Sequence, residues 1–182
     1  MNKRRWTLFG AVVLIIGVIA IVSELTGGKE GGKSTPPVSA LVGRSVKDFS
    51  LDGLSGGTIR APWASGHSSV LVFFASYCVP CQSEMPKIAN YIRLHNPSPI
   101  TVLGVDALDV RSSALAMMKR DHVTFPVAFD PNGAVTSGVF GFGTIPESVF
   151  LNSKGIVVRV YYGAIPKQQL AIGIKKLNST PG

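Results

Sequence analysis

The stretch Val70-Leu71-Val72-Phe73-Phe74-Ala75-Ser76-Tyr77-Cys78-Val79-Pro80-Cys81 joins an apolar run to the only two cysteines of the chain. A continuous apolar run of this length predicts a buried strand. A disulfide between cysteines three residues apart stabilises a fold little, because the entropic gain grows with loop length. If a helix begins at the pair, its unpaired N–H groups and dipole favour a thiolate at Cys78. Since the thiolate is the nucleophile of thiol–disulfide exchange, the stretch predicts a redox site at a strand–helix junction.

Strand and helix patterns alternate along the rest of the chain. We expect further strands at residues 46–51, 100–105, 125–129, 148–151 and 156–161. We expect helices at residues 78–96, 111–122 and 166–177, the first with a kink at Pro86. Turn residues occupy 52–57, 130–133 and 152–155. This order predicts an α/β protein with parallel β-α-β units first, an antiparallel hairpin last, and a mixed sheet covered by helices.

The N-terminus has the pattern of a membrane segment. Residues 1–6 form a basic end, and the seventeen residues 7–23 carry no charge. That length is the lower limit for crossing a hydrocarbon core of about 30 Å. The basic end should stay in the cytoplasm, which places the chain after Glu24 outside. We expect an uncleaved transmembrane anchor; a cleaved signal peptide, with a weak cleavage site at residues 18–20, is the alternative.

Residues 24–41 read as a flexible linker, because Gly, Ser, Lys and Pro dominate them. A globular domain then follows at residues 42–178, with a short tail at 179–182. Residues 27–34 match the spacing of a phosphate-binding loop, G-x-x-x-x-G-K-S. That loop works only between a strand and a helix, and the prolines that follow block a helix here. We therefore expect no nucleotide site.

Charge and ligand chemistry narrow the function further. The formal net charge is +8, but the basic residues are scattered rather than clustered, so we expect no nucleic-acid partner. His67, His95 and His122 are isolated. No second pair of cysteines or histidines completes a four-ligand zinc site. We expect neither a metal nor a cofactor, because the dithiol is itself the redox centre.

Several motifs, in this order and spacing, resemble the membrane-anchored thioredoxin-like proteins of the TlpA/ResA/CcmG family. They are the opening G-x-x-x-x-D-F-x-L at 43–51, F-F-A-S-Y-C-V-P-C at 73–81, E-M-P at 84–86, G-T-I-P-E at 143–147 and the hairpin at 150–155. The resemblance covers about residues 42–177. It implies a thioredoxin fold, with a central mixed β-sheet flanked by helices and an N-terminal transmembrane helix. It also implies a protein thiol–disulfide oxidoreductase.

The resemblance assigns roles to five residues around the dithiol. Cys78 corresponds to the exposed nucleophile, and Cys81 to the shielded thiol that resolves the mixed disulfide. Pro146 corresponds to a cis-proline that faces the dithiol, and Ile145 before it would offer backbone groups to an extended substrate strand. Tyr77 stands where the family usually has Trp, and its ring would still shield the dithiol and take part in substrate binding. The alternative is a surface aromatic of no consequence.

Glu84 lies one helical turn after Cys81. The matching Glu of ResA-like proteins lies in the active-site cavity, where a carboxylate can exchange protons with the buried thiol or change its pKa. The alternative is an acid on the helix surface. Thioredoxin itself has a buried Asp on the strand before its active site, and Val72 occupies that position here. Proton transfer must therefore differ from that of thioredoxin.

The resemblance implies an extracytoplasmic, membrane-anchored reductant. Its partners would be thiols or disulfides of exported proteins, apocytochrome c among them, with a membrane-embedded thiol reductase as the electron donor. An oxidant of exported proteins is the alternative. A peroxidase is disfavoured because Leu71 and Ala75 stand where peroxiredoxins need Pro and Thr or Ser. A Cu(I)-binding assembly protein is a third alternative, although the usual third ligand is missing.

Overall fold

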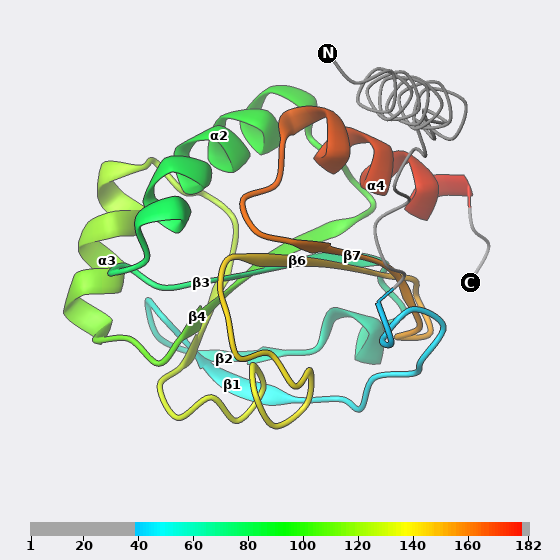
Figure 1. Cartoon of the computed structure of the whole chain (residues 1–182), viewed down its shortest axis with the longest axis horizontal. Coiled ribbons are helices and arrows are strands. Elements are labelled where there is room, and N and C mark those ends of the chain that lie inside the picture. Colours follow the sequence, from blue (N-terminus) through cyan, green and yellow to red (C-terminus); the bar gives the residue numbers. More distant parts are fainter. Residues whose placement is uncertain (1–38, 180–182) are drawn as a thin grey trace, which may run out of the picture. The chain divides into compact units, whose positions relative to one another are not determined.

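The computed structural model describes residues 39–179, where seven strands form one mixed sheet in the order β2-β1-β5-β4-β3-β6-β7 (Figure 1). The strands are β1 (Ser50–Gly53), β2 (Thr58–Arg60), β3 (Ser69–Phe74), β4 (Thr101–Ala107), β5 (Val127–Asp130), β6 (Glu147–Leu151) and β7 (Val157–Tyr162). The helices are α2 (Val79–His95), α3 (Arg111–Arg120) and α4 (Lys167–Ser179), with a short 3₁₀ helix η1 (Pro62–Ser65).

The centre of the sheet is parallel and its flanks are antiparallel. β3, β4 and β5 run parallel, with Val70 opposite Val102 and Val105 opposite Ala128. β6 and β7 add an antiparallel hairpin on one side, and β1 with β2 adds another on the other side. The predicted mixed sheet is thus confirmed. It has the arrangement of a thioredoxin fold.

Each face of the sheet packs against its own apolar cluster, because side chains along a strand alternate between faces. Val70, Val72 and Phe74 of β3 contact the cluster formed with α2, α3 and α4. Leu71 and Phe73 contact the opposite cluster, to which the segment 131–145 contributes. In Figure 1 the three helices lie on one side of the sheet and this segment, in yellow, on the other. All six residues of β3 are buried, as its apolar pattern predicted.

The predicted strand at 46–51 was wrong at its start. β1 begins at Ser50, and before it Ser45 forms only an isolated bridge with Ile156. The short strand β2 was missed, because Thr58–Arg60 is a three-residue edge strand with no buried residue. The residues expected as a turn at 52–57 connect β1 and β2 as a hairpin, in which the Gly53 N–H donates to the Gly57 carbonyl at 2.8 Å.

Local signals set the ends of α2. Cys78 is its N-cap, and the helix runs through Pro86 to Asn96, whose left-handed backbone at φ 36° ends it. α4 follows Pro166 directly, in accord with the preference for proline at a helix start. These boundaries differ from those predicted by two residues or fewer.

Between residues 39 and 179 no helix is long and apolar enough to span a bilayer. The predicted basic end at 1–6 and anchor at 7–23 lie outside the described residues. So do most of the predicted linker at 24–41 and most of the tail at 179–182.

Candidate active site

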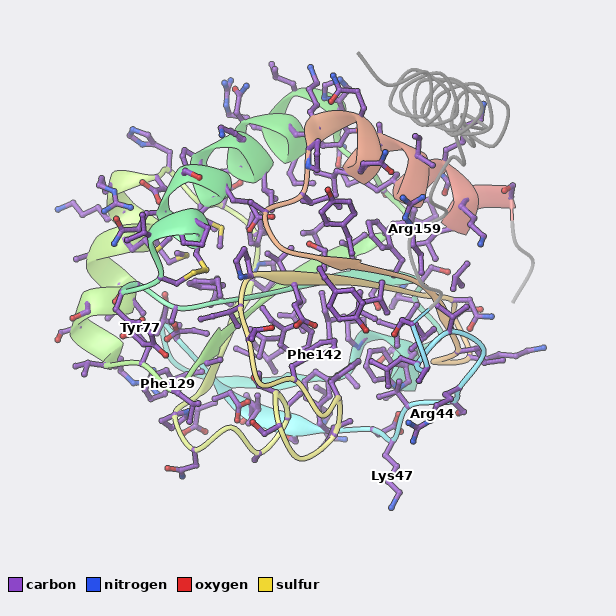
Figure 2. The ribbon with its side chains drawn as sticks, viewed as in Figure 1. Arg44, Lys47, Tyr77, Phe129, Phe142 and Arg159 are labelled. Carbon is purple, nitrogen blue, oxygen red and sulfur yellow. A yellow bond between two sulfur atoms is a disulfide. The ribbon has the colours of Figure 1, made fainter. Side chains whose placement is uncertain are left out.

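The strand–helix junction places Cys78 at the N-terminus of α2. Its Sγ accepts a hydrogen bond from the Cys81 N–H at 3.2 Å, so a cysteine sulfur fills the position usually taken by a serine or aspartate oxygen. Cys78 and Cys81 are joined by a disulfide, which appears as a yellow bond near the start of α2 in Figure 2. The N–H groups of the first helical turn favour a negative charge on this sulfur once the disulfide is reduced.

The two sulfurs differ in exposure, but less than expected. Cys81 is fully buried and Cys78 keeps 8% of its accessible surface, so Cys78 is nearly enclosed rather than openly exposed. An incoming thiol can therefore reach the pair from the Cys78 side only. The nucleophilic role of Cys78 and the resolving role of Cys81 stay predictions that agree with this order of accessibility.

The loop before β6 borders the disulfide. The Ile145–Pro146 peptide bond is cis, as the resemblance implied. The Ile145 carbonyl oxygen lies 3.7 Å from Cys78 Sγ, which brings together residues 67 apart in the sequence. The Pro146 carbonyl accepts a hydrogen bond from the Gly163 N–H at 2.8 Å. Gly163 directly follows β7, so the turn after this strand holds the loop in place. The structure thus brings Ile145 to the dithiol, while its role in binding a substrate remains a prediction.

Tyr77, which directly precedes Cys78 in the sequence, carries a largely exposed ring. Its side chain is 61% exposed, and within the described residues it has no hydrogen bond or ring contact (Figure 2). Apolar side chains are similarly exposed at Val79, between the cysteines, and at Leu108 and Val110, after β4. This exposure leaves the shielding and substrate-binding roles of Tyr77 as predictions. The exposed ring is available to a partner.

Glu84 is buried, so the alternative of a surface acid is wrong. The side chain is 1% exposed, and its Oε1 accepts a hydrogen bond from the Ile165 N–H at 2.5 Å. Its Oε2 is buried without a hydrogen-bond partner. Burial raises the pKa of this carboxyl to about 7, while the bond from Ile165 and the charge of Lys87 lower it. A group with this pKa can both release and accept a proton near neutral pH.

Sequence reasoning missed two further buried carboxyl groups whose pKa is raised by burial. Glu147 starts β6 directly after Pro146, and its Oε1 accepts from Thr144 Oγ1 at 3.0 Å. Burial raises its pKa to about 7, and the bond from Thr144 lowers it. Asp106, near the end of β4, is fully buried, and burial raises its pKa to about 8. For Asp106 the available signal was an acidic residue within an apolar strand run.

The site is therefore a buried cysteine pair, with buried carboxyl groups on α2, β6 and β4. Among residues 39–179 no group of three or more His, Cys, Asp or Glu side chains could hold a metal ion. The fold, the cysteine pair at the start of α2 and the cis-proline loop together define a redox protein of the thioredoxin class.

Comparison with known proteins gives the family. Residues 41–173 match the redoxin family, and the chain belongs to it. The thiol-disulfide oxidoreductase ResA of Bacillus thuringiensis (strain Al Hakam) is 27% identical over 177 residues, which cover 97% of this chain and 99% of ResA. The chain is a protein thiol–disulfide oxidoreductase, with Cys78 and Cys81 as its cysteine pair.

Solved structures agree with the fold. StoA from Bacillus subtilis matches with a TM-score of 0.62 and 26% identity, over 70% of this chain and 96% of StoA. The dsbF protein of MTB, solved in mixed oxidised and reduced forms, matches with a TM-score of 0.64 and 26% identity, over 77% of this chain and 98% of dsbF.

Proposed function

We propose that this protein reduces disulfides of exported proteins on the outer side of the cytoplasmic membrane, tethered there by residues 7–23. The observation that carries the proposal is the cysteine pair at the start of α2, with Cys78 at the surface edge and Ile145 beside it. The basic end and the uncharged run of the N-terminus support export.

The surroundings of the dithiol favour a protein substrate over a small molecule. The exposed side chains of Tyr77, Val79, Leu108 and Val110 come from two segments. These segments are joined where Asp109 accepts hydrogen bonds from the backbone and side chain of Ser76. Exposed apolar surface beside a reactive group is typical of a protein-binding site. An extended chain can bury its own apolar side chains here while its backbone passes the Ile145–Pro146 loop.

The reaction starts from the reduced protein. The Cys78 thiolate attacks one sulfur of the substrate disulfide, which forms a mixed disulfide and releases the other substrate sulfur as a thiolate. The Cys81 thiol loses its proton and attacks Cys78 Sγ. This step releases the second substrate sulfur and leaves the Cys78–Cys81 disulfide. Two electrons pass to the substrate in total.

Glu84 is suited to receive the proton of Cys81. The two residues are three apart on the same buried face of α2, where side chains at this spacing are neighbours. With a pKa raised to about 7 by burial, the Glu84 carboxyl can take up a proton from a thiol and release it later.

The direction of electron flow is the finer part of the proposal. Pro80 precedes the second cysteine, as in reducing thioredoxins, and favours a reductant. A membrane-embedded thiol reductase would then return the disulfide to the dithiol, and apocytochrome c is one substrate of the required kind. An oxidant of exported proteins is the alternative outcome.

Trapping tests the roles of the two cysteines. With full-length protein, we expect Cys81→Ser to accumulate mixed disulfides with exported proteins, because the nucleophile remains and the resolving thiol is gone. Cys78→Ser is the matched control and should trap none. Trapping by Cys78→Ser alone would reverse the assigned roles, and trapping of cytoplasmic proteins would contradict the proposed location.

The reduction potential of the pair tests the direction. A potential near or below about −250 mV indicates a reductant that needs a membrane electron donor, whereas one near −120 mV indicates an oxidant. The second result would replace the proposed reductase with an enzyme that installs disulfides.

A further inference from the structure

Asp109 is a half-buried acid in the loop between β4 and α3, and the reaction steps leave it unused. Its carboxylate accepts hydrogen bonds from the Ser76 N–H and, at 3.0 Å, from the Ser76 hydroxyl. It also accepts from the N–H of the next residue, Val110, at 2.6 Å. Since Ser76 and Asp109 are 33 residues apart in the chain, this one side chain joins the loop before Cys78 to the loop after β4.

Ser76 lies two residues before Cys78, and both of its backbone polar groups are bonded. The Ser76 carbonyl accepts a hydrogen bond from Gln82 Nε2 at 2.7 Å, and Gln82 belongs to the helix that carries the dithiol. Among the described residues the Ser76 N–H has no acceptor other than Asp109. The Cys78 N–H donates to the Ala75 carbonyl at 3.2 Å, so Ser76 lies inside the turn that leads to the nucleophile. Asp109 therefore anchors this turn to a different part of the fold.

The backbone just before Asp109 is unusual. Leu108 has a φ of 54°, in the left-handed region that a leucine rarely adopts. Its N–H donates to the Asp130 carbonyl at 3.0 Å, which helps to hold this conformation. Leu108 is 54% exposed, so burial of its side chain does little to offset the unfavourable backbone. Unfavourable backbone conformations that the surroundings maintain are found preferentially at functional sites. The turn at Leu108 leads directly to the acid that binds Ser76.

Hydrogen-bond donors, and no ion pair, hold the Asp109 carboxylate. Among residues 39–179 no lysine or arginine forms an ion pair with it. Arg111, two residues later, donates instead to two carbonyls of the β1–β2 hairpin, at 2.8 Å and 2.6 Å. The link between the two loops therefore depends on the bonds between Asp109 and Ser76, and an uncharged side chain of the same shape can make bonds of this kind.

We infer that Asp109 is a positioning residue for thiol–disulfide exchange: its bonds to Ser76 hold the loop before Cys78 against the loop after β4. The inference rests on the proposed role of Cys78 as the attacking thiol. With its loop fixed, Cys78 meets a substrate sulfur in one orientation, which reduces the entropy that must be lost to reach the transition state. The joined loops also keep the exposed side chains of Tyr77 and Leu108 in fixed places for a substrate chain.

The first test measures the link in solution, with the full-length oxidised protein in detergent. Hydrogen exchange of the Ser76 amide is followed by NMR in the wild type and in Asp109→Ala. We expect exchange to be about tenfold faster or more in the variant, because a hydrogen bond to a charged acceptor is lost. The Asn96 N–H, which donates to the Ile92 carbonyl at the far end of α2, reports on the rest of the fold and should keep its rate.

The second test measures exchange with a synthetic peptide that carries two cysteines flanked by apolar residues. The rate is followed in both directions, from the reduced protein with the peptide disulfide and from the oxidised protein with the peptide dithiol. We expect Asp109→Ala to slow both directions by the same factor of about ten, within the roughly 100-fold that a 1 Å misplacement can cost. Equal factors leave the reduction potential unchanged, because a positioning residue alters the barrier and not the end states.

Asp109→Asn separates the hydrogen bonds from the charge. Its amide oxygen can accept from the Ser76 N–H, and its amide N–H can donate to the Ser76 hydroxyl oxygen. We expect its rates in both directions to lie much closer to those of the wild type than to those of Asp109→Ala. Asp48→Ala, which removes an exposed charge before β1, is the matched control and should have wild-type rates.

Three results would overturn the inference: unchanged Ser76 exchange in Asp109→Ala, wild-type rates in that variant, or an Asn variant as slow as the Ala variant. Slowing in one direction only, with a shifted reduction potential, would also contradict it, because Asp109 would then stabilise one redox state. If Asp109→Ala does not fold, Ser76→Ala decides the question: it removes one of the two bonds and should slow both directions by a smaller, equal factor, and unchanged rates would refute the inference.

Failure of the proposed function is recognised separately. If the wild type exchanges with the peptide in both directions but Cys81→Ser traps no exported protein, the proposed function is wrong and the role of Asp109 stands. If trapping succeeds and the Asp109 variants match the wild type, only the inference about Asp109 fails.

Discussion

Two neighbouring strands each carry a buried aspartate near their carboxyl ends, Asp106 on β4 and Asp130 on β5, and their surroundings are opposite. Asp130 is 1% exposed and accepts hydrogen bonds from the N–H groups of Val135 and Thr136 and from Thr136 Oγ1, the last at 2.7 Å. Asp106 is equally buried and accepts none. The difference cannot come from burial, and it lies in the donors that the following loop provides.

Asp130 is thus a structural acid, whereas Asp106 lies on the strand next to the one that leads to the cysteine pair. The segment after Asp130 folds back to stabilise the carboxylate. The segment after Asp106 instead turns towards Ser76, and the acid retains its proton up to a pKa of about 8. Glu84 and Glu147 resemble Asp106, since each has one carboxyl oxygen without a partner. The dithiol end of the sheet thus retains groups whose ionisation destabilises the fold, as functional sites often do.

The largest expected effect on stability comes from replacing Asp130, the aspartate with hydrogen-bond donors. Asp130→Ala leaves the N–H groups of Val135 and Thr136 and the Thr136 hydroxyl without their buried acceptor. We expect a loss of about 3–5 kcal/mol in the free energy of unfolding, because each buried unsatisfied group costs about 1–3 kcal/mol. Urea unfolding near neutral pH measures it. A loss as small as that of an exposed substitution would show that the two aspartates do not differ in kind.

Asp106→Asn should instead increase the free energy of unfolding. The folded-state pKa is raised from 3.8 to about 8, so the native state holds the proton longer than the unfolded chain. The contribution of this acid to stability is therefore full below about pH 4 and is lost as the pH rises to about 8. We expect the variant to gain about 2–4 kcal/mol over the wild type at neutral pH, at about 1.4 kcal/mol per pKa unit. Little gain should remain near pH 4.

Urea unfolding at several pH values measures this difference. Asp130→Asn is the comparison variant, because it alters the satisfied aspartate by the same chemical change. If Asp130→Asn were more stable than the wild type and Asp106→Asn less stable, the expected difference between the two aspartates would be contradicted.

Glu84→Gln should show the same sign with a smaller size. Burial raises the pKa of Glu84 from 4.5 to about 7, so its contribution to stability is lost as the pH rises between these values. The gain from removing the charge is offset because the Ile165 N–H loses a charged acceptor. We expect a net gain of about 1–2 kcal/mol above about pH 7 and none near pH 4. If the difference in stability between Glu84→Gln and the wild type did not vary with pH, Glu84 would have the same pKa in the folded and the unfolded protein.

Glu147→Gln should have the smallest effect of the four. Its pKa is raised to about 7 by burial, and the bond from Thr144 Oγ1 can be kept by the glutamine carbonyl. We expect a gain of about 1 kcal/mol or less above about pH 7, measured by the same unfolding series. If Glu147→Gln gained more stability than Glu84→Gln, ionisation of the acid after the Ile145–Pro146 loop would destabilise the fold more than ionisation of the acid on α2.

The sequence predicted the fold where local signals were strong. The apolar pattern of β3, the proline before α4 and the turn at 152–155 located their elements within about two residues. It failed at the start of β1 and at β2, since an exposed three-residue edge strand forms only through pairing with its neighbour. The Cys78 and Cys81 pair and the cis bond before Pro146 were also predicted, because short motifs carry them.

The environment of those residues was not predictable to the same degree. Tyr77 was expected to shield the dithiol and is exposed, while Glu84 could not be assigned to the surface or the interior from spacing alone. The burial of Asp106 and Glu147 was not predicted, because the sequence does not show whether an acid on a strand will find hydrogen-bond donors in the fold. Exposure and hydrogen bonding depend on segments distant in the chain, such as Ile165 beside Glu84.

By itself, the sequence determined an α/β chain with a redox-active cysteine pair at the start of a helix, because strand periodicity and C-x-x-C spacing are local properties. Only the tertiary structure decided which acids are buried around that pair and which of them lack donors. The physical reason is that the free energy of a buried carboxyl group depends on the groups that fold against it. For Asp106 those groups are Asp109, Arg111 and Asp130, and for Asp130 they are Val135 and Thr136.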